Sequence, residues 1–472
     1  MFKGLFVSAA AVIYLLTAVL AFGAEGNGRH PNILLITIDT LRADHLSSYG
    51  YPLKTSPAID YLAERGVRFS SAHSPIPLTG PSHVSLFTSR FPQEHGARVN
   101  GYAVDKNSKW LFLPQILRRF GYFNAAFISA WPLTSRLTHL DRWFDVYDED
   151  LSRKYQVFNS SRYAEDVTPL VTDWLENRPP RPFFLWVHYF DPHSPYHLRD
   201  GFEELAKSGH PDNRPLSKNQ EMTDRIRNYD SEIAYTDFHI GKLLKRIDAL
   251  GLTDSTLVVL TSDHGESLGE HGYVGHGRAL SQGIVGIPLI LRYPDVIPAG
   301  QVIDANVSLL DVTPTVLELA IGSQNEKTLP TSFIGRSLVS AVTKHEPIPS
   351  RPIRYISFAG KKGWMPQKLL PAAFASWLAQ FWVNADRSPI LVGQTFGDEK
   401  SIWRPRKKSI SVFDISSDPF EENPVVVNRT DPSYHSRKKP LSQWFEATDL
   451  SVGESRMGKR DVEILKSLGY IQ

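Results

Sequence analysis

Three short apolar runs, each followed closely by acidic or histidine side chains, constrain the fold of this chain more than any other feature. The runs span residues 33–38, 183–187 and 257–262 and consist mostly of Ile, Leu, Val and Phe. Apolar runs of this length are typical of parallel strands that are buried on both faces of a sheet. The sequence therefore predicts an α/β fold, in which helices flank a doubly wound and mostly parallel sheet.

Polar side chains follow each of these predicted strands. Asp39 follows the first, the segment 188–196 with its histidines and aspartate follows the second, and Asp263 and His264 follow the third. Ligands of doubly wound sheets bind at the carboxyl ends of the strands, so we expect these side chains to converge on one site. Asp39, Asp263 and His264 suit a divalent cation such as Zn²⁺, Mn²⁺, Mg²⁺ or Ca²⁺.

The stretch 77–88 predicts a helix that begins near Thr79. Thr79 can act as the N-cap, Pro81 lies in the first turn, and apolar residues follow at helical spacing. A hydroxyl at a helix N-terminus faces unpaired N–H groups, which suits a nucleophile that attacks an anionic ester. In isolation such a threonine is more often only a helix cap, and the strand-end clusters are what favour a catalytic role. A nearby cation would lower the pKa of the Thr79 hydroxyl.

Composition limits the chemistry open to the chain. None of its 472 residues is cysteine, which excludes disulfides and any thiolate nucleophile or metal ligand. The formal net charge of +2 does not suggest a nucleic-acid-binding protein. The length is sufficient for a catalytic α/β domain, predicted at residues 31–322, and for a smaller α+β subdomain at residues 323–472.

The N-terminus predicts export. Lys3 precedes an apolar run from Gly4 to Phe22, and small residues follow at a suitable cleavage position. This pattern indicates a secretory signal peptide at residues 1–23 and a periplasmic or extracellular protein. The run of about 19 residues is also long enough for an uncleaved membrane anchor, which is the alternative and would be the only contact with a membrane.

Weaker patterns predict the other elements. The basic clusters at 404–408 and 437–439 are more typical of a solvated surface than of a binding site for an anionic polymer. The expected helices are 57–65, 111–121, 222–250, 311–319 and 462–468; the expected strands are 66–69, 124–129, 288–292, 353–358, 381–384 and 410–413; 90–96 and 199–221 are expected loops, and 130–165 is expected to be irregular.

Several motifs together resemble the sulfatase branch of the alkaline phosphatase superfamily. They lie at residues 31–39, 79–83, 191–196 and 261–266, with thinner matches at 414–419 and 467–470. The resemblance implies an alkaline-phosphatase-like sheet. It also implies a metal on Asp39, Asp263 and His264, with Thr79 as the nucleophile that touches it. His193 matches a histidine that holds the ester group.

The chain departs from the sulfatase pattern at four positions. Sulfatases oxidise a Cys or Ser to formylglycine and continue the motif with Arg, whereas this chain has Thr79 and His83 there. A threonine cannot give that aldehyde. Thr40 replaces a second aspartate, so the metal site has one carboxylate fewer, and His276 stands where many sulfatases place a lysine.

A threonine nucleophile is the pattern of phosphodiesterases and of phosphoethanolamine and lipoteichoic-acid-type transferases in the same superfamily. We therefore predict a hydrolase that cleaves phosphate or sulfate esters through Thr79, with phosphoesters preferred. His193 or His276 would assist the leaving group, and His83 is counted with the candidate catalytic residues. One divalent metal is expected, either Ca²⁺, Mn²⁺ or Zn²⁺, because no convincing Asp-x-x-x-His set for a second is present.

Three alternatives remain open from the sequence. The protein could be a sulfatase that works without formylglycine, a transferase that passes the group to an alcohol, or a non-catalytic binding protein that keeps the metal pocket. The expected substrate is an anionic ester on a small molecule, a glycan or a lipid headgroup, with no nucleic acid involved.

Overall fold

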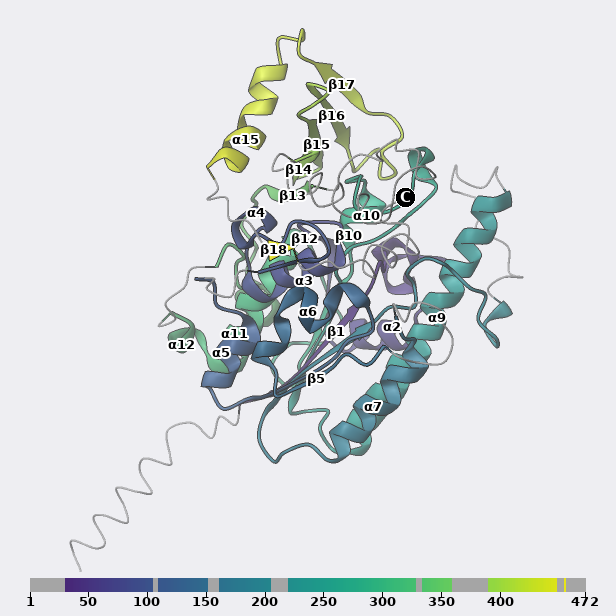
Figure 1. Ribbon diagram of the computed structural model, residues 1–472, viewed down its shortest axis with the longest axis vertical. Coiled ribbons are helices and arrows are strands. Elements are labelled where there is room, and N and C mark those ends of the chain that lie inside the picture. The colour runs from purple at the N-terminus through teal and green to yellow at the C-terminus, as the bar shows by residue number, and fades with distance from the viewer. Residues whose placement is uncertain are drawn as a thin grey trace, which may run out of the picture.

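Helices cover both faces of a large sheet, and a smaller antiparallel sheet lies at one end of the molecule (Figure 1). The computed structural model describes residues 30–104, 109–151, 161–204, 220–327, 333–358, 389–447 and 454–455. Within these residues no helix is both long and apolar enough to cross a membrane. The predicted signal segment, the strand at 381–384 and the helix at 462–468 lie outside the described residues.

The large sheet is mostly parallel, as predicted. Its order is β10-β2-β11-β7-β1-β6-β4-β5. A further strand, β12, lies outside this order and pairs in parallel with β2. Parallel pairing joins β7 to β1, β1 to β6, β6 to β4 and β4 to β5, whereas β11 runs antiparallel to its neighbours. The strands are β1 (Asn32–Ile38), β2 (Val67–His73), β4 (Phe123–Phe127), β5 (Val146–Asp148), β6 (Phe183–Tyr189), β7 (Thr256–Ser262), β10 (Gly286–Ile287), β11 (Leu289–Arg292) and β12 (Gln301–Ser308).

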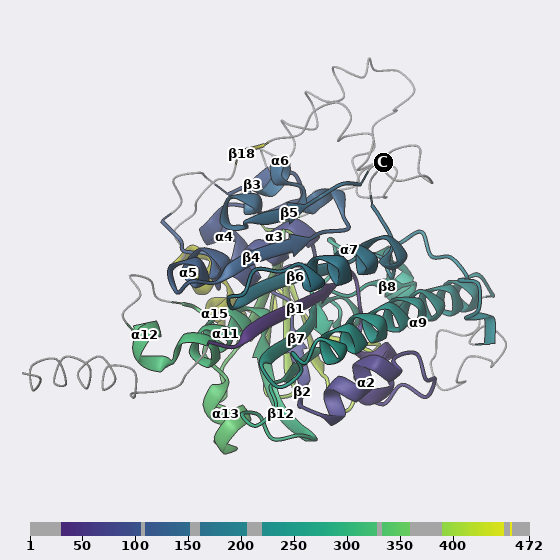
Figure 2. The same cartoon turned by 90° about the horizontal axis from the view of Figure 1, so that it is seen from below.

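Successive side chains of the central strand enter two different hydrophobic cores. Ile33 and Leu35 pack into the first core, while Leu34 and Ile36 pack into the second. Burial of each such side chain contributes about 1.5–3 kcal/mol, which explains why the predicted strands are apolar throughout. The first core lies under α3 (Thr79–Thr88), α5 (Leu113–Arg119) and α11 (Val312–Ile321); the second lies under α2 (Pro57–Glu64), α7 (Ala164–Glu176) and α9 (Gln220–Ala249) (Figure 2).

The smaller C-terminal sheet packs against the segment that leads into α3. Ile76 and Leu78 share a hydrophobic core with side chains of this sheet, and Ile356 N–H donates to the carbonyl of Pro75 at 2.9 Å. The small sheet therefore supports the start of α3. It contains β13 (Ile353–Ser357), β14 (Leu391–Phe396), β15 (Glu399–Arg404), β16 (Ser409–Asp414) and β17 (Val425–Asn428) in that order, with α15 (Tyr434–Glu446) packed on them.

The predicted division at residue 322 stays a prediction. Leu338 and Val342, which lie beyond it, pack into the first core of the large sheet. The small sheet begins only at Ile353. The segment between residue 322 and Ile353 holds α12 (Ser323–Lys327) and α13 (Val339–Lys344).

Two segments contain more structure than the sequence indicated. The expected loop at 90–96 holds the one-turn helix α4 (Pro92–His95), where Glu94 accepts a hydrogen bond from Phe91 N–H at 3.0 Å. The irregular segment at 130–165 supplies β5, the edge strand. The remaining short elements are η1 (Ala43–His45), η2 (Ser47–Tyr49), β3 (Tyr102–Ala103), η3 (Trp131–Leu133), α6 (Ser135–Thr138), η4 (Leu140–Trp143), β8 (Ser267–Leu268), η6 (Glu270–Gly272), β9 (Val274–Gly275), α10 (Gln282–Val285), η7 (Leu309–Asp311) and β18 (Glu454–Ser455).

Candidate active site at the carboxyl ends of the strands

Three neighbouring strands bring Asp39, His188 and Asp263 to one edge of the sheet. Asp39 directly follows β1, Asp263 directly follows β7, and His188 is the second-last residue of β6. Because β6 and β7 both pair in parallel with β1, their last residues lie side by side. All three side chains are buried. We call them the open cluster.

The open cluster has the spacing and the unpaired atoms of a metal site. One ligand atom from each residue lies within 4.8 Å of the other two, and His188 Nε2 is 3.6 Å from Asp39 Oδ2. Among the described residues, no hydrogen bond reaches Asp39 Oδ1, Asp263 Oδ2 or either ring nitrogen of His188. Leaving a buried polar atom unpaired costs about 1–3 kcal/mol, so these residues fit a bound cation better than a closed polar network.

Electrostatics also favour a cation here. Burial, together with the charges of Asp263 and Glu266, raises the pKa of Asp39 well above its ordinary value. Burial also raises the pKa of Asp263, which His83 partly offsets. Burial lowers the pKa of His188 well below the ordinary histidine value, and neighbouring histidines lower it further. Two buried carboxyl groups that ionise with difficulty on their own would ionise readily around a positive ion.

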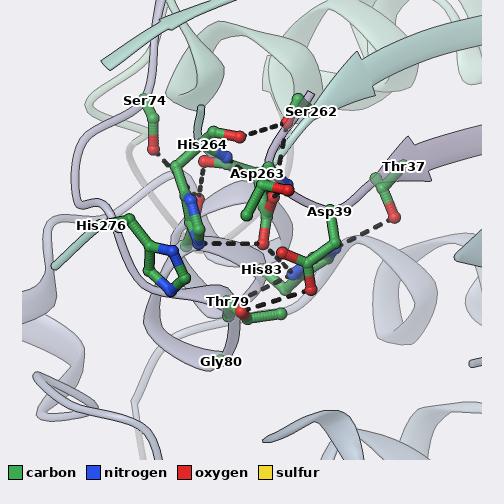
Figure 3. A network of polar contacts seen from close by, with 12 residues as sticks. Thr37, Asp39, Ser74, Thr79, Gly80, His83, Ser262, Asp263, His264 and His276 are labelled. Atoms are coloured by element: carbon green, nitrogen blue, oxygen red, sulfur yellow. Dashed lines mark hydrogen bonds and ion pairs between the residues drawn. The ribbon is translucent and has the colours of Figure 1, made fainter. Parts of the chain in front are cut away.

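Thr79 points toward the open cluster from the start of α3. The sequence suggested Thr79 as the N-cap, but the helix begins at Thr79 itself and Leu78 is the N-cap. The Thr79 hydroxyl instead donates to Asp39 Oδ2 at 3.5 Å (Figure 3). The next residue is fixed because Gly80 N–H donates to Asn100 Oδ1 at 2.9 Å. The hydroxyl therefore faces the cluster and does not close the end of its own helix.

His83 lies one turn along α3 and contacts the backbone carbonyl of Thr79. Its Nδ1 is 2.8 Å from the carbonyl oxygen of Thr79, and its Nε2 is 3.0 Å from Thr37 Oγ1. Trp186 Nε1 donates to the same hydroxyl of Thr37 at 2.8 Å. A carbonyl can only accept, so Nδ1 carries the proton and Nε2 accepts from Thr37. Both ring nitrogens of His83 are thus engaged with the protein.

A second group of histidines lies on the other side of Asp263. The ring centroids of His264 and His276 are 4.4 Å apart, and those of His193 and His276 are 5.1 Å apart. Glu266 accepts from His276 Nδ1 at 3.0 Å, which fixes the orientation of that ring. His264 Nε2 is 3.5 Å from Asp263 Oδ2. Burial lowers the pKa of each of these three histidines to about 3, so they are neutral near pH 7.

Comparison with known proteins settles the family. The sulfatase family model matches residues 31–323, which is more than half of the chain. The chain belongs to the sulfatase family. An N-acetylglucosamine-6-O-sulfatase of Bacteroides thetaiotaomicron is 25% identical, over 62% of this chain and 68% of its own length. The N-acetylgalactosamine-6-sulfatase of Mus musculus is 28% identical, over 66% of this chain and 67% of its own.

A solved structure agrees with the fold. The phosphonate monoester hydrolase of Agrobacterium radiobacter superposes with a TM-score of 0.64, covering 88% of this chain and 95% of that protein, at 18% identity. Membership of the sulfatase family places the chain among hydrolases that act on ester bonds. The roles of the individual site residues remain predictions.

The structure brings together most of the residues that the sequence singled out and adds two. Asp39, Thr79 and Asp263 converge, and His264 Nε2 lies 3.5 Å from Asp263 Oδ2. His188 was seen only as part of a polar segment and was not assigned as a ligand. A histidine that continues a wholly apolar strand is the signal that could have identified it, because such a position is buried. Glu266, the partner of His276, was the second omission.

Proposed function

We propose that this sulfatase-family protein is an exported, metal-dependent hydrolase that cleaves anionic esters through Thr79, with phosphoesters preferred over sulfate esters. The observation that carries the proposal is the Thr79 hydroxyl, which lies at a helix N-terminus and donates to Asp39 of the open cluster. The absence of cysteine supports it, because formylglycine cannot be formed from a thiol here.

Asp39, Asp263 and His264 would hold one divalent cation, with the Thr79 hydroxyl in contact with it, as the resemblance implies. When bound, this ion would lower the pKa of the Thr79 hydroxyl and neutralise the oxygens of the ester. The unpaired atoms of the open cluster support this assignment. The proposed substrates are anionic esters carried by small molecules, glycans or lipid headgroups.

Thr79 Oγ would attack the phosphorus or sulfur atom in line with the leaving oxygen. The bond from Oγ to that atom forms while the ester bond to the alcohol breaks, leaving an ester on Thr79. His276 or His193, which is neutral near pH 7, would take up the proton that Thr79 Oγ loses and pass it to the leaving oxygen. The hydrogen bond from His276 Nδ1 to Glu266 leaves Nε2 as the ring nitrogen that would take up and pass on this proton. Water then attacks the same atom and the bond to Thr79 Oγ breaks, while one proton of the water passes through the same histidine to Oγ.

The second step favours phosphate. A sulfate group on Thr79 must be removed by direct attack of water, because threonine has no second hydroxyl through which sulfate could be eliminated. Water attacks a threonine phosphate more easily in such a site, since a cation and nearby histidines stabilise the negative charge on the phosphoryl oxygens. The preference therefore follows from the side chain at position 79.

Sulfate ester hydrolysis is the second candidate. It is favoured by relatives such as an N-acetylglucosamine-6-O-sulfatase and an N-acetylgalactosamine-6-sulfatase. For this chain it would require water to cleave a threonine sulfate at a useful rate. A modest sulfatase side activity is compatible with the first proposal.

Matched aryl phosphate, aryl phosphonate monoester and aryl sulfate substrates separate the two candidates. We expect kcat/KM to be clearly higher for a phosphorus ester than for the sulfate, and Thr79→Ala to abolish turnover of all three. Thr79→Ser keeps the hydroxyl and should keep activity. If the aryl sulfate is the best substrate and its turnover depends on Thr79, the phosphoester preference is wrong.

Export has its own test. The signal pattern at residues 1–23 supports cleavage during secretion. N-terminal sequencing of the protein from its natural location should then begin after residue 23. A mature protein that still begins at Met1 or Phe2 would favour the membrane anchor.

A further inference from the structure

The surroundings of His188 are unusual for a histidine with a purely structural role. It is fully buried, it lies opposite Thr37 of β1 in the sheet register, and its ring nitrogens receive no hydrogen bond from any residue that the structure describes. The preceding residues of β6 are all buried and apolar. An imidazole continuing this run, with both nitrogens unpaired, costs free energy unless it binds something.

The distances around His188 fit a shared cation. Two ligand atoms on one tetrahedral zinc ion lie about 3.3 Å apart, because each bond is about 2.0–2.1 Å long. His188 Nε2 is 3.6 Å from Asp39 Oδ2, which is too long for a normal hydrogen bond and close to that spacing. Asp263 supplies the third atom within 4.8 Å.

Thr40 explains why the site would need an imidazole. The resemblance to sulfatases places a second aspartate at this position, next to Asp39. Thr40 borders the open cluster, because its N–H donates to Asp263 Oδ1 at 3.3 Å. Its φ of 55° lies in the left-handed region, which a β-branched residue rarely adopts and which aspartate tolerates better. The site therefore has one carboxylate fewer than the sulfatase pattern, and the imidazole of His188 lies beside the two that remain.

We propose that His188 is a metal ligand that replaces the missing carboxylate, and that this exchange makes the site select Zn²⁺ over Ca²⁺. The inference rests on the metal dependence that the proposed function assumes. Ca²⁺ takes six to eight oxygen ligands, which the open cluster with its two carboxylates does not supply. Imidazole nitrogen is instead a good ligand for Zn²⁺, which needs only four ligands.

Metal binding to the full-length, metal-free protein tests the proposal without reference to turnover. Titration calorimetry with ZnCl₂ and with CaCl₂ should give one tight zinc site and much weaker calcium binding. His188→Ala should weaken zinc binding more than about 100-fold, because loss of a ligand costs more than loss of an outer-shell partner. The melting temperature of the metal-free variant shows whether it is folded, and His188→Asn provides a second variant with a polar side chain.

His276→Ala is the matched control. It removes a histidine whose side chain is 5% exposed and whose ring centroid is 4.4 Å from that of His264, but which is not part of the open cluster. Zinc affinity should stay close to that of the parent. If His276→Ala abolishes zinc binding while both His188 variants keep it, the metal lies among the other histidines and the proposal is overturned.

Restoring the missing carboxylate tests the selectivity. In the double variant Thr40→Asp, His188→Asn, the site has three carboxylates and no imidazole from β6. We expect zinc affinity to fall and calcium affinity to rise by at least about tenfold, so that the ratio of the two dissociation constants shifts toward calcium. An unchanged ratio would overturn the proposed basis of selectivity.

Failure of this inference differs from failure of the proposed function. If Asp263→Asn abolishes metal binding and turnover while His188→Asn binds zinc as the parent does, only the role of His188 is wrong. If Asp263→Asn leaves metal content and turnover unchanged, the metal-dependent function itself is wrong.

Discussion

The open cluster differs sharply from a second buried polar cluster, to which Tyr229 connects it. That cluster, which we call the closed cluster, consists of His45, Tyr51 and Asp230. His45 Nδ1 is 2.7 Å from Asp230 Oδ1, and Tyr51 donates to Asp230 Oδ2 at 2.6 Å. Both carboxylate oxygens of Asp230 are therefore paired, whereas Asp39 and Asp263 each keep an oxygen that no hydrogen bond from a described residue reaches.

Burial alone therefore does not identify a functional site. The side chains of both clusters are buried. Tyr229 connects them, because its ring packs 5.1 Å from His45 and its hydroxyl donates to the carbonyl of Thr40 at 2.7 Å. A buried polar group whose partners lie within the chain stabilises the fold, while one without such partners is available for a ligand. Mutations in the two clusters should accordingly change different properties.

The largest expected effect is on turnover, from Asp263→Asn in the open cluster. We expect kcat/KM to fall by about 10³-fold or more, because the metal that Asp263 would hold stabilises the transition state by several kcal/mol. The metal-free protein should be as stable as the parent or more stable, since the substitution removes a charge that is buried at a cost. Parallel rate and denaturant-unfolding measurements check both parts. A large loss of stability in the metal-free variant would contradict the distinction between the clusters.

Asp230→Ala in the closed cluster should instead change stability and leave zinc binding unchanged. It leaves His45 and Tyr51 without their buried acceptor, which should lower the free energy of unfolding by about 2–4 kcal/mol. The folded fraction should bind zinc with the parent affinity. Urea unfolding and zinc titration at low temperature test this. If stability is unchanged but zinc affinity falls, the closed cluster belongs to the functional site.

A metal should stabilise the protein in a way that depends on pH. Burial raises the pKa of Asp39 and Asp263 in the folded, metal-free protein. Groups whose folded pKa is raised contribute stability below their unfolded pKa, near 4, and lose that contribution as pH rises through the folded pKa. The metal-free protein should thus lose stability from about pH 4 toward neutrality. Metal at 100 times its Kd should add about 2.7 kcal/mol near pH 7. Identical pH profiles with chelator and with zinc would exclude a cation at these carboxylates.

The smallest expected effect is that of Glu266→Gln. The amide can still accept from His276 Nδ1 but no longer stabilises a positive charge on the ring, so we expect kcat to fall by about tenfold with little change in KM. Substrates with good leaving groups should be affected less, because they need less protonation. A loss that is equal for good and poor leaving groups would assign Glu266 a purely structural role.

The sequence predicted those parts of the site that depend on local pattern. The apolar runs and the acidic residues that end them identify the strands, their shared edge, Asp39 and Asp263. The role of His188 depends on the pairing of β6 with β1, which brings together residues far apart in sequence. The orientation of Thr79 depends on where α3 begins, and that start is supported by the small sheet through Leu78. The local pattern indicates only that His188 is buried, whereas its neighbours and the start of α3 depend on contacts between distant segments.

Covalent labelling of Thr79 tests the central claim most directly. The protein is mixed with a phosphorus-32-labelled aryl phosphate in a single turnover, quenched in acid and digested, and the label is located by mass spectrometry. The account predicts label on Thr79 in the parent and none in Thr79→Ala, which should also fail to turn over. Absence of label from Thr79, combined with undiminished turnover by Thr79→Ala, would contradict the account.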